Sequence, residues 1–126
     1  YKLYVSGQYE CDKKGLIMCD TKYEFGKAAD GTIMLIDEIH TIESTRYWKK
    51  GSYESRIAEG LSPENLDKDI IRGYVSKGLD VPEDVLDTLL TYYSYVYETL
   101  SGDVITEVSS YKDLDIKSII DKYNNI

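Results

Sequence analysis

The chain of 126 residues carries a formal net charge of -8, with apolar and charged fractions that are ordinary for a globular protein. This length allows one domain with a single modest core. The acidic excess argues against electrostatic binding to DNA or RNA, and no apolar run approaches the ~20 residues of a membrane-spanning helix. The two cysteines, Cys11 and Cys19, have neither zinc-site nor disulfide-framework spacing. We therefore expect a cytoplasmic protein without nucleic-acid or membrane partners.

A helix and a β-hairpin are expected in the first half of the chain. In chain order, we expect a helix, a strand, a turn and a return strand over residues 1–14, 16–25, 26–31 and 32–36. Gly15 provides the helix stop, and an Asp-Gly pair marks the turn. From Asp20 to Phe25 the polar and apolar side chains alternate strictly, which is typical of a strand.

The second half of the chain is expected to be mainly helical. Residues 39–61 show no sustained period and are predicted to be mostly loop. Ser62-Pro63-Glu64 predicts a helix start, with a cap residue, a proline at the first helical position and an acid near the positive end of the helix dipole. Two further helices are expected from Pro82 to Leu100 and from Leu114 to Tyr123. The fold class is therefore α+β, with an antiparallel hairpin packed against C-terminal helices.

Polar side chains on one face of the hairpin form a candidate site. Asp20, Lys22 and Glu24 point to the same side of the strand, and a solvated outer face is the simplest interpretation of such a pattern. The acidic pair that ends the return strand adds a second carboxylate, but its identity depends on the register. If the numbers of paired residues sum to an odd number, Asp37 joins the face of Lys22 and Glu24; if they sum to an even number, Glu38 does. Either arrangement suits a Mg²⁺–phosphate site.

Four motifs, in order along the chain, make this sequence similar to the SAICAR synthetase family. Residues 15–26, GLIMCDTKYEFG, resemble the family signature in which a GLI run leads into DxKxEFG. Residues 35–48, LIDEIHTIESTRYW, are similar to the next family motif, LxDE followed by PDxxRxW. Residues 66–72, LDKDIIR, resemble a DKxxxR helix, and residues 100–102, LSG, resemble an LTG close. The resemblance as a whole spans nearly residues 3–102.

This resemblance implies the C-terminal, ATP-grasp-like portion of the SAICAR synthetase fold. Residues 1–126 would form a single C-terminal region, with a helix, hairpin and substrate loop in residues 1–60 and a helical part in residues 61–126. Family members begin with an N-terminal ATP-binding lobe, and nothing in this chain resembles it. The missing initiator Met suggests a chain that begins inside a longer gene product. We expect this chain to be inactive by itself and to need that lobe as a partner.

The resemblance also implies a reaction. Family members use ATP to join L-aspartate to carboxyaminoimidazole ribonucleotide in purine (IMP) biosynthesis, through an acyl phosphate, with release of ADP and phosphate. Glu24 and Asp37 would hold Mg²⁺, which selects the odd hairpin register, and Lys22 and Arg46 would be catalytic. The residues expected to bind substrate are Asp20, Lys22, Glu43, Arg46, Asp67, Lys68 and Arg72.

Two departures from the family pattern keep an alternative open. Ile42-Glu43 stands where the family has Pro-Asp, and the ATP-binding lobe is missing. The alternative is a non-catalytic remnant or fragment that binds a nucleotide or another protein. His40 is expected to have a loop-packing or solvent role rather than a catalytic one. Self-association into a homo-oligomer is a further open alternative.

Overall fold

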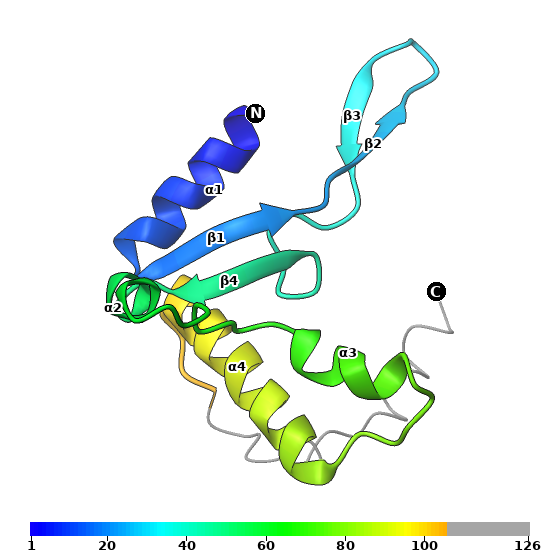
Figure 1. The fold of residues 1–126 in the computed structure, drawn as a ribbon. Helices are drawn as coiled ribbons and strands as arrows, with labels where there is room; N and C mark the ends of the chain where they lie inside the picture. Colours follow the sequence, from blue (N-terminus) through cyan, green and yellow to red (C-terminus); the bar gives the residue numbers. More distant parts are fainter. Residues whose placement is uncertain (106–126) are drawn as a thin grey trace.

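A computed structural model describes residues 1–105 as an α+β fold, which confirms the predicted class (Figure 1). The expected helix from Leu114 to Tyr123 lies outside the described residues. No helix within residues 1–105 is long and apolar enough to cross a membrane. In chain order the elements are α1 (Lys2–Lys13), β1 (Leu16–Thr21), β2 (Glu24–Lys27), β3 (Ile33–Ile36), β4 (Thr45–Lys49), α2 (Tyr53–Ala58), α3 (Asp69–Val75) and α4 (Glu83–Ser101).

The first and last helices begin and end where the sequence predicts. After α1, Gly15 adopts a φ of 78°, a conformation that glycine reaches without a steric penalty. Pro82 is the N-cap of α4, and Gly102 ends that helix with a φ of 85° and donates its N–H to the carbonyl of Glu98. Both helices therefore stop at a left-handed glycine.

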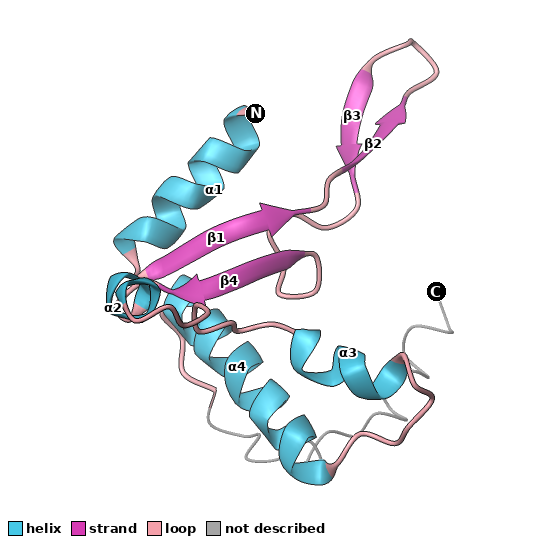
Figure 2. Cartoon of the chain, viewed as in Figure 1, coloured by secondary structure: helices cyan, strands magenta, loops and turns pink. Residues whose placement is uncertain are grey.

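The predicted strand over residues 16–25 is two strands that pair with different partners. β1 pairs with β4, and β2 pairs with β3, in two separate antiparallel sheets (Figure 2). The change occurs at Lys22, whose N–H still bonds the carbonyl of Ser44 beside β4. The β2–β3 hairpin consequently projects away from the rest of the molecule (Figure 1).

A β-bulge at Cys19 turns the polar end of β1 outward. Met18 pairs with Tyr47 and Asp20 pairs with Arg46, so Cys19 is the extra residue. Met18 and Tyr47 are buried. In an uninterrupted strand, Asp20 would share the face of Met18 and point into the core. The bulge moves Asp20 to the exposed face, opposite Arg46.

Residues 39–61 are more regular than predicted, and the following helix begins later. They contain β4 and α2, two elements that the prediction of mostly loop missed. The segment from Ser62 to Leu66 is not helical, because its backbone extends the edge of β4. Lys49 N–H bonds the Glu64 carbonyl and Leu66 N–H bonds the Tyr47 carbonyl, at 3.1 and 2.9 Å. Tertiary hydrogen bonds thus override the helix-start pattern.

The core lies where α1, the β1–β4 sheet and α4 meet. Its members are buried and come from elements far apart in sequence. They are Cys11, Leu16, Met18, Tyr47, Leu66 and Val96. By contrast, the hairpin exposes four large apolar side chains, Phe25, Ile33, Met34 and Ile36.

His40 fixes the segment that returns from the hairpin to the sheet. Its backbone has a φ of 55°, its carbonyl accepts a hydrogen bond from Tyr47 Oη at 2.6 Å, and its ring Nε2 hydrogen-bonds Tyr23 Oη. The ring lies against Gly7 of α1, where an added Cβ would come within 2.5 Å of it. The expected packing role of His40 is therefore confirmed.

Gly7→Ala should lower the free energy of unfolding by about 1–3 kcal/mol, because the methyl group would displace the His40 ring from α1. Urea denaturation followed by circular dichroism measures the change. Gly51→Ala is the matched control, since no atom lies within 4 Å of a Cβ at that position. Equal stability of the two variants would contradict the proposed contact.

Candidate functional site

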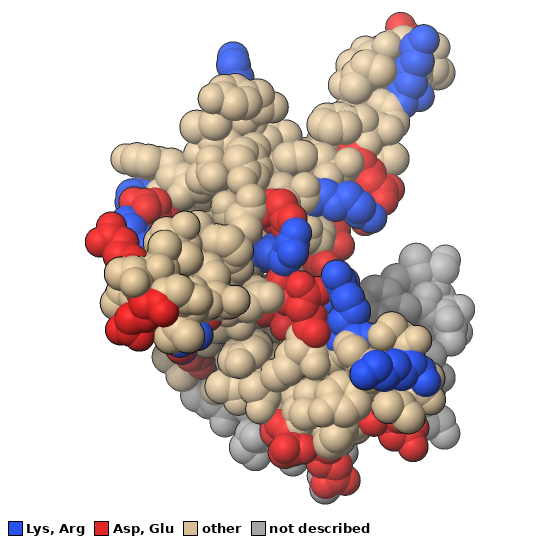
Figure 3. All heavy atoms as spheres, viewed as in Figure 1, with Lys and Arg blue, Asp and Glu red and all other residues tan. Residues whose placement is uncertain are grey.

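A cavity of about 410 Å³ lies between the β1–β4 sheet, the segment before β4 and α3. All seven residues predicted to bind substrate line it, although they come from three separate stretches of the chain. Figure 3 shows acidic and basic side chains interleaved on this side of the molecule. The lining residues are Asp20, Thr21, Lys22, Ile42, Glu43, Ser44, Thr45, Arg46, Asp67, Lys68, Asp69 and Arg72.

Arg46 and Asp20 form a forked pair across β1 and β4. Arg46 Nε donates to both carboxylate oxygens of Asp20, at 2.9 and 3.1 Å, and Nη2 donates to Oδ2. The hydrogen bond from Arg46 holds the pKa of Asp20 below its ordinary value. This geometry fixes the guanidinium plane at the cavity wall and leaves Nη1 3.8 Å from Asp69.

Asp69, which sequence reasoning missed, joins the two arginines of the cavity. Its Oδ1 lies 2.7 Å from Arg72 Nη2, and its Oδ2 lies 3.8 Å from Arg46 Nη1. The Asp69–Arg72 pair has the i,i+3 spacing of a helix face. That spacing could have indicated the Asp69–Arg72 pair from the sequence. The pairing of Asp69 with Arg46 depends on where α3 packs relative to the sheet.

Glu43 bridges the segment before β4 to both α3 and α4. One carboxylate oxygen accepts a hydrogen bond from Tyr93 Oη at 2.6 Å, and the other lies 2.9 Å from Lys68 Nζ. Lys68 also donates to the Glu43 carbonyl at 3.0 Å. The bond from Tyr93, followed by the interaction with Lys68, lowers the pKa of Glu43. Tyr93 is the second residue that sequence reasoning missed, because its 50-residue separation from Glu43 leaves no local pattern.

The hairpin has the even register, so the prediction of an odd register is wrong. Glu24 pairs with Ile36 and Phe25 pairs with Leu35. Asp37 nevertheless lies beside Lys22, because its φ of 67° takes it out of the strand alternation. Lys22 Nζ lies 2.6 Å from Glu24 Oε1 and 3.9 Å from Asp37 Oδ2. The structure thus brings these three residues together at the base of the hairpin, next to the cavity.

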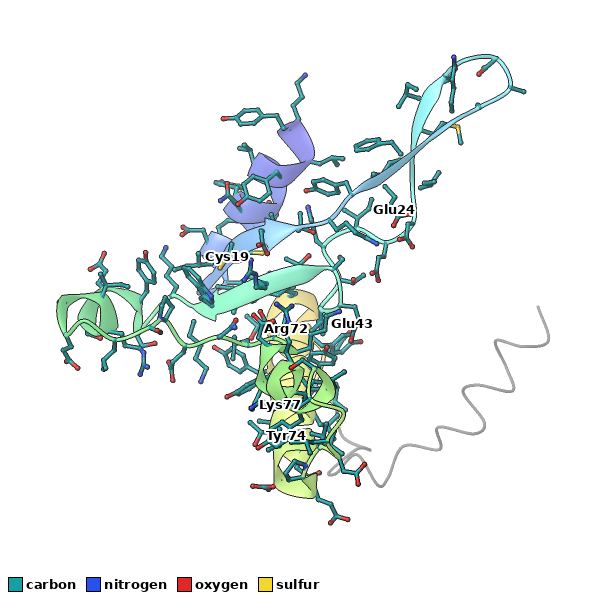
Figure 4. All side chains as sticks on the ribbon, turned by 45° about the vertical axis from the view of Figure 1, so that its right-hand side comes forward. Cys19, Glu24, Glu43, Arg72, Tyr74 and Lys77 are labelled. Carbon is teal, nitrogen blue, oxygen red and sulfur yellow. The ribbon has the colours of Figure 1, made fainter. Side chains whose placement is uncertain are left out.

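The two carboxylates around Lys22 suit a Mg²⁺ ion in their chemistry. Mg²⁺ binds through one or two carboxylates and completes its shell with water and phosphate oxygens. Glu24 and Asp37 provide such a pair, and both side chains are about half exposed. No group of three or more His, Cys, Asp or Glu residues within residues 1–105 could hold a metal ion. Figure 4 shows Glu24 at the hairpin base, apart from Glu43 and Arg72.

Asp67 differs from the other acids of the cavity because it is buried, with 3% of its surface exposed. Its Oδ1 accepts hydrogen bonds from Asn65 Nδ2 at 3.1 Å and from the backbone N–H of Asp69 at 2.7 Å. Asp67 Oδ2 and Asn65 Oδ1 are both buried and have no hydrogen-bond partner among the described residues. Asp67 also lines a second cavity, of about 500 Å³.

Tyr93→Phe should raise the pKa of Glu43 towards its ordinary value, because the carboxylate loses its closest donor. A depressed pKa stabilises the fold above the ordinary pKa, and that contribution is lost as the pH falls through the folded value. The variant should therefore lose less stability on acidification. Carboxyl NMR titration measures the pKa. Tyr95→Phe, also on α4, is the control and should leave the pKa of Glu43 unchanged; the same pKa in both variants would exclude the bridge.

Comparisons with known proteins place the chain in a family. A family model described as SAICAR synthetase matches residues 1–88. The chain is 44% identical over 112 residues to the chloroplastic phosphoribosylaminoimidazole-succinocarboxamide synthase of Arabidopsis thaliana, which covers 82% of this chain and 27% of that protein. It is 39% identical over 111 residues to the synthase of the same name from Legionella pneumophila (strain Paris). This match covers 81% of this chain and 36% of that protein.

Solved structures give the same result. SAICAR-synthase from Saccharomyces cerevisiae, complexed with SAICAR, matches with a TM-score of 0.66 and 31% identity, over 83% of this chain and 36% of that one. A SAICAR synthetase (Type-2) in complex with ADP matches with a TM-score of 0.58 and 28% identity, over 83% of this chain and 36% of that one. The chain therefore spans between 27% and 36% of the length of these four relatives. With the family model matching more than half of its length, the chain belongs to the SAICAR synthetase family.

Proposed function

We propose that the protein containing this chain joins L-aspartate to carboxyaminoimidazole ribonucleotide at the expense of ATP, in purine biosynthesis. The observation that carries the proposal is the 410 Å³ cavity, which gathers four cationic side chains around one space. A nucleotide with a phosphate and a carboxylate needs such a set of positive groups. The related structures in complex with SAICAR and with ADP support the same substrate class.

In this proposal, the cations of the cavity bind and orient the anionic substrates. Lys22 and Arg46 contact the reacting carboxylate and phosphate oxygens, and Lys68 and Arg72 bind the remaining anionic groups. ATP transfers its terminal phosphate to the imidazole carboxylate. The aspartate amine then attacks the resulting acyl phosphate, so that a C–N bond forms, the C–O bond to phosphate breaks and phosphate leaves. Charge neutralisation and positioning supply most of the catalysis in chemistry of this kind.

Glu24 and Asp37 are the proposed Mg²⁺ ligands. Both already share the ammonium of Lys22, so the site holds two negative charges against one fixed positive charge. A bound Mg²⁺ would neutralise phosphate oxygens of ATP. Lys22 keeps its proton at neutral pH, because the hydrogen bond to Glu24 raises its pKa above the ordinary value. Its role is therefore that of a fixed positive charge.

The exposed apolar side chains of the β2–β3 hairpin fit contact with an N-terminal lobe of the same protein. Phe25, Ile33, Met34 and Ile36 are each more than 40% exposed. A projecting hairpin with such a surface is typical of an element that another part of the protein covers. We place the ATP-binding residues in that lobe. A cytoplasmic location stays a prediction, and one plant relative is named as chloroplastic.

Glu24→Gln and Asp37→Asn should each lower kcat by at least about 100-fold in the complete gene product, because the loss of either carboxylate removes a metal ligand. ADP release with ATP, Mg²⁺, carboxyaminoimidazole ribonucleotide and L-aspartate measures the activity. Glu54→Gln is the control, since this residue lies on α2 and outside the cavity.

Three results would contradict parts of this proposal. If the wild-type protein shows no ADP release that requires both substrates, it is not the ligase. The non-catalytic binding module is then the better explanation. Activity of Glu24→Gln or Asp37→Asn close to wild type excludes these two residues as the metal site. A lowered thermal midpoint in either variant would assign the loss to folding instead.

A further inference from the structure

We propose that Tyr93 of α4 is a positioning residue for the ligase reaction, because its hydroxyl holds Glu43 in the orientation that fixes Lys68 at the wall of the first cavity. The inference rests on the proposed function, in which Lys68 binds an anionic group of a substrate. Tyr93 itself does not line that cavity. It therefore acts through its two neighbours and does not touch a substrate.

Tyr93 lies on a helix that is fixed to the core. Val96, one turn further along α4, is fully buried, and Tyr92 and Leu100 pack against the buried cluster. Side chains three positions apart lie on the same side of a helix, so Tyr93 and Val96 both face the body of the molecule. The phenol ring thus has a fixed position from which to orient a side chain of the segment before β4.

The hydrogen bond between Tyr93 and Glu43 has a defined direction. Tyr93 Oη lies 2.6 Å from Glu43 Oε1, a distance typical of a hydroxyl that donates to a carboxylate. Burial, followed by the hydrogen bond to Glu43, raises the pKa of Tyr93, so the phenol keeps its proton. The same bond is the main cause of the lowered pKa of Glu43. Donor and acceptor therefore keep complementary protonation states at neutral pH.

The carboxylate that Tyr93 holds is the one that fixes Lys68. Glu43 Oε2 lies 2.9 Å from Lys68 Nζ, and the same ammonium donates to the Glu43 carbonyl at 3.0 Å. An exposed ion pair between two long side chains is weak, because both lose rotamer freedom when it forms. With Oε1 anchored by Tyr93, the glutamate has already lost that freedom. Lys68 consequently meets a carboxylate in a fixed orientation.

A purely structural tie between α4 and the segment before β4 is the other explanation of these contacts. That segment has anchors of its own on both sides of Glu43. The carbonyl of His40 accepts a hydrogen bond from Tyr47 Oη at 2.6 Å, and the carbonyl of Ser44 accepts one from the N–H of Lys22 at 3.0 Å. Because the backbone is held without Tyr93, the effect of the phenol on Lys68 explains the contact better.

The first test measures how accessible the Lys68 amine is in the complete gene product, without substrate. N-hydroxysuccinimidyl acetate modifies lysine amines, and mass spectrometry gives the rate of modification at each position. Lys68 must leave both oxygens of Glu43 before it reacts, so Tyr93→Phe should raise its rate at least about twofold. Lys77, an exposed lysine just after α3, is the internal reference and should keep its rate.

The second test separates positioning from a structural role by a double-variant cycle. Lys68→Gln should raise KM for carboxyaminoimidazole ribonucleotide at least about tenfold, and Tyr93→Phe should raise it about threefold, since each weakens a charge-assisted contact. In Tyr93→Phe, kcat should stay within about twofold, because Lys68 is not among the groups that contact the reacting oxygens. Residues that act through one contact have non-additive effects, so adding Tyr93→Phe to Lys68→Gln should change KM by less than about 1.5-fold.

Tyr95→Phe, on an exposed side of α4, is the matched control and should leave both the Lys68 rate and KM unchanged. An unchanged Lys68 rate in Tyr93→Phe would overturn the proposal, as would an equal rise in KM with and without Lys68. If Tyr93→Phe fails to fold, Glu43→Gln takes its place, and an unchanged Lys68 rate in that variant overturns the proposal.

The labelling needs no substrate, so the two proposals fail separately. A protein that shows the labelling difference without substrate-dependent ADP release contradicts the proposed function and leaves the position of Lys68 dependent on Tyr93. A protein that releases ADP but shows no labelling difference is the ligase, and Tyr93 is then not a positioning residue.

Discussion

The antiparallel pairing of β1 with β4, offset by the bulge at Cys19, positions both the core and the cavity. It buries Met18 against Tyr47 and, two residues later, turns Asp20 outward to meet Arg46. One sheet therefore has an apolar face for the core and a charged face for the cavity. Without the extra residue, the alternation of a regular strand would place Asp20 in the core, where an unpaired carboxylate is strongly unfavourable.

The charged cavity does not hold the fold together. Its ion pairs are largely exposed, and pairs of this kind contribute about 0–1 kcal/mol each. Stability comes instead from the buried cluster under the sheet, to which Leu66 and Val96 contribute from distant parts of the chain. The ion pairs set the positions of the cations, and in the proposed function this preorganised surface receives the anionic substrates. In the proposed function, the oxygens of an anionic substrate replace the protein carboxylates as partners of these cations.

The network around Glu43 shows how a departure from the family pattern can be accommodated. The resemblance predicts an aspartate at this position, preceded by proline. Here the longer glutamate reaches Tyr93 on α4 and Lys68 before α3, and both of its oxygens are engaged. Glu43 also holds Lys68 at the cavity, and substrate binding by Glu43 stays a prediction. The same segment is also anchored through His40, whose ring packs on Gly7.

The local motifs determined much of what could be predicted. The glycine stops of α1 and α4 and the α+β class follow from short patterns, and seven of the residues that line the first cavity follow from motif resemblance. Each of these patterns and motifs involves residues within a few positions of one another. The sequence also indicated that Glu24 and Asp37 would accompany Lys22, although for the wrong reason, since the hairpin has the even register and the positive φ of Asp37 restores the contact.

Only the tertiary structure decided where strands change partners and which polar atoms are left without donors. The break at Lys22, the strand β4 in a predicted loop and the extended segment before α3 all result from backbone hydrogen bonds between residues distant in sequence. The burial of Asp67 has the same origin, because it follows from that segment joining the edge of β4. A sequence pattern specifies which side chains a strand or helix can present, but hydrogen bonding and burial against distant elements select which of them meet.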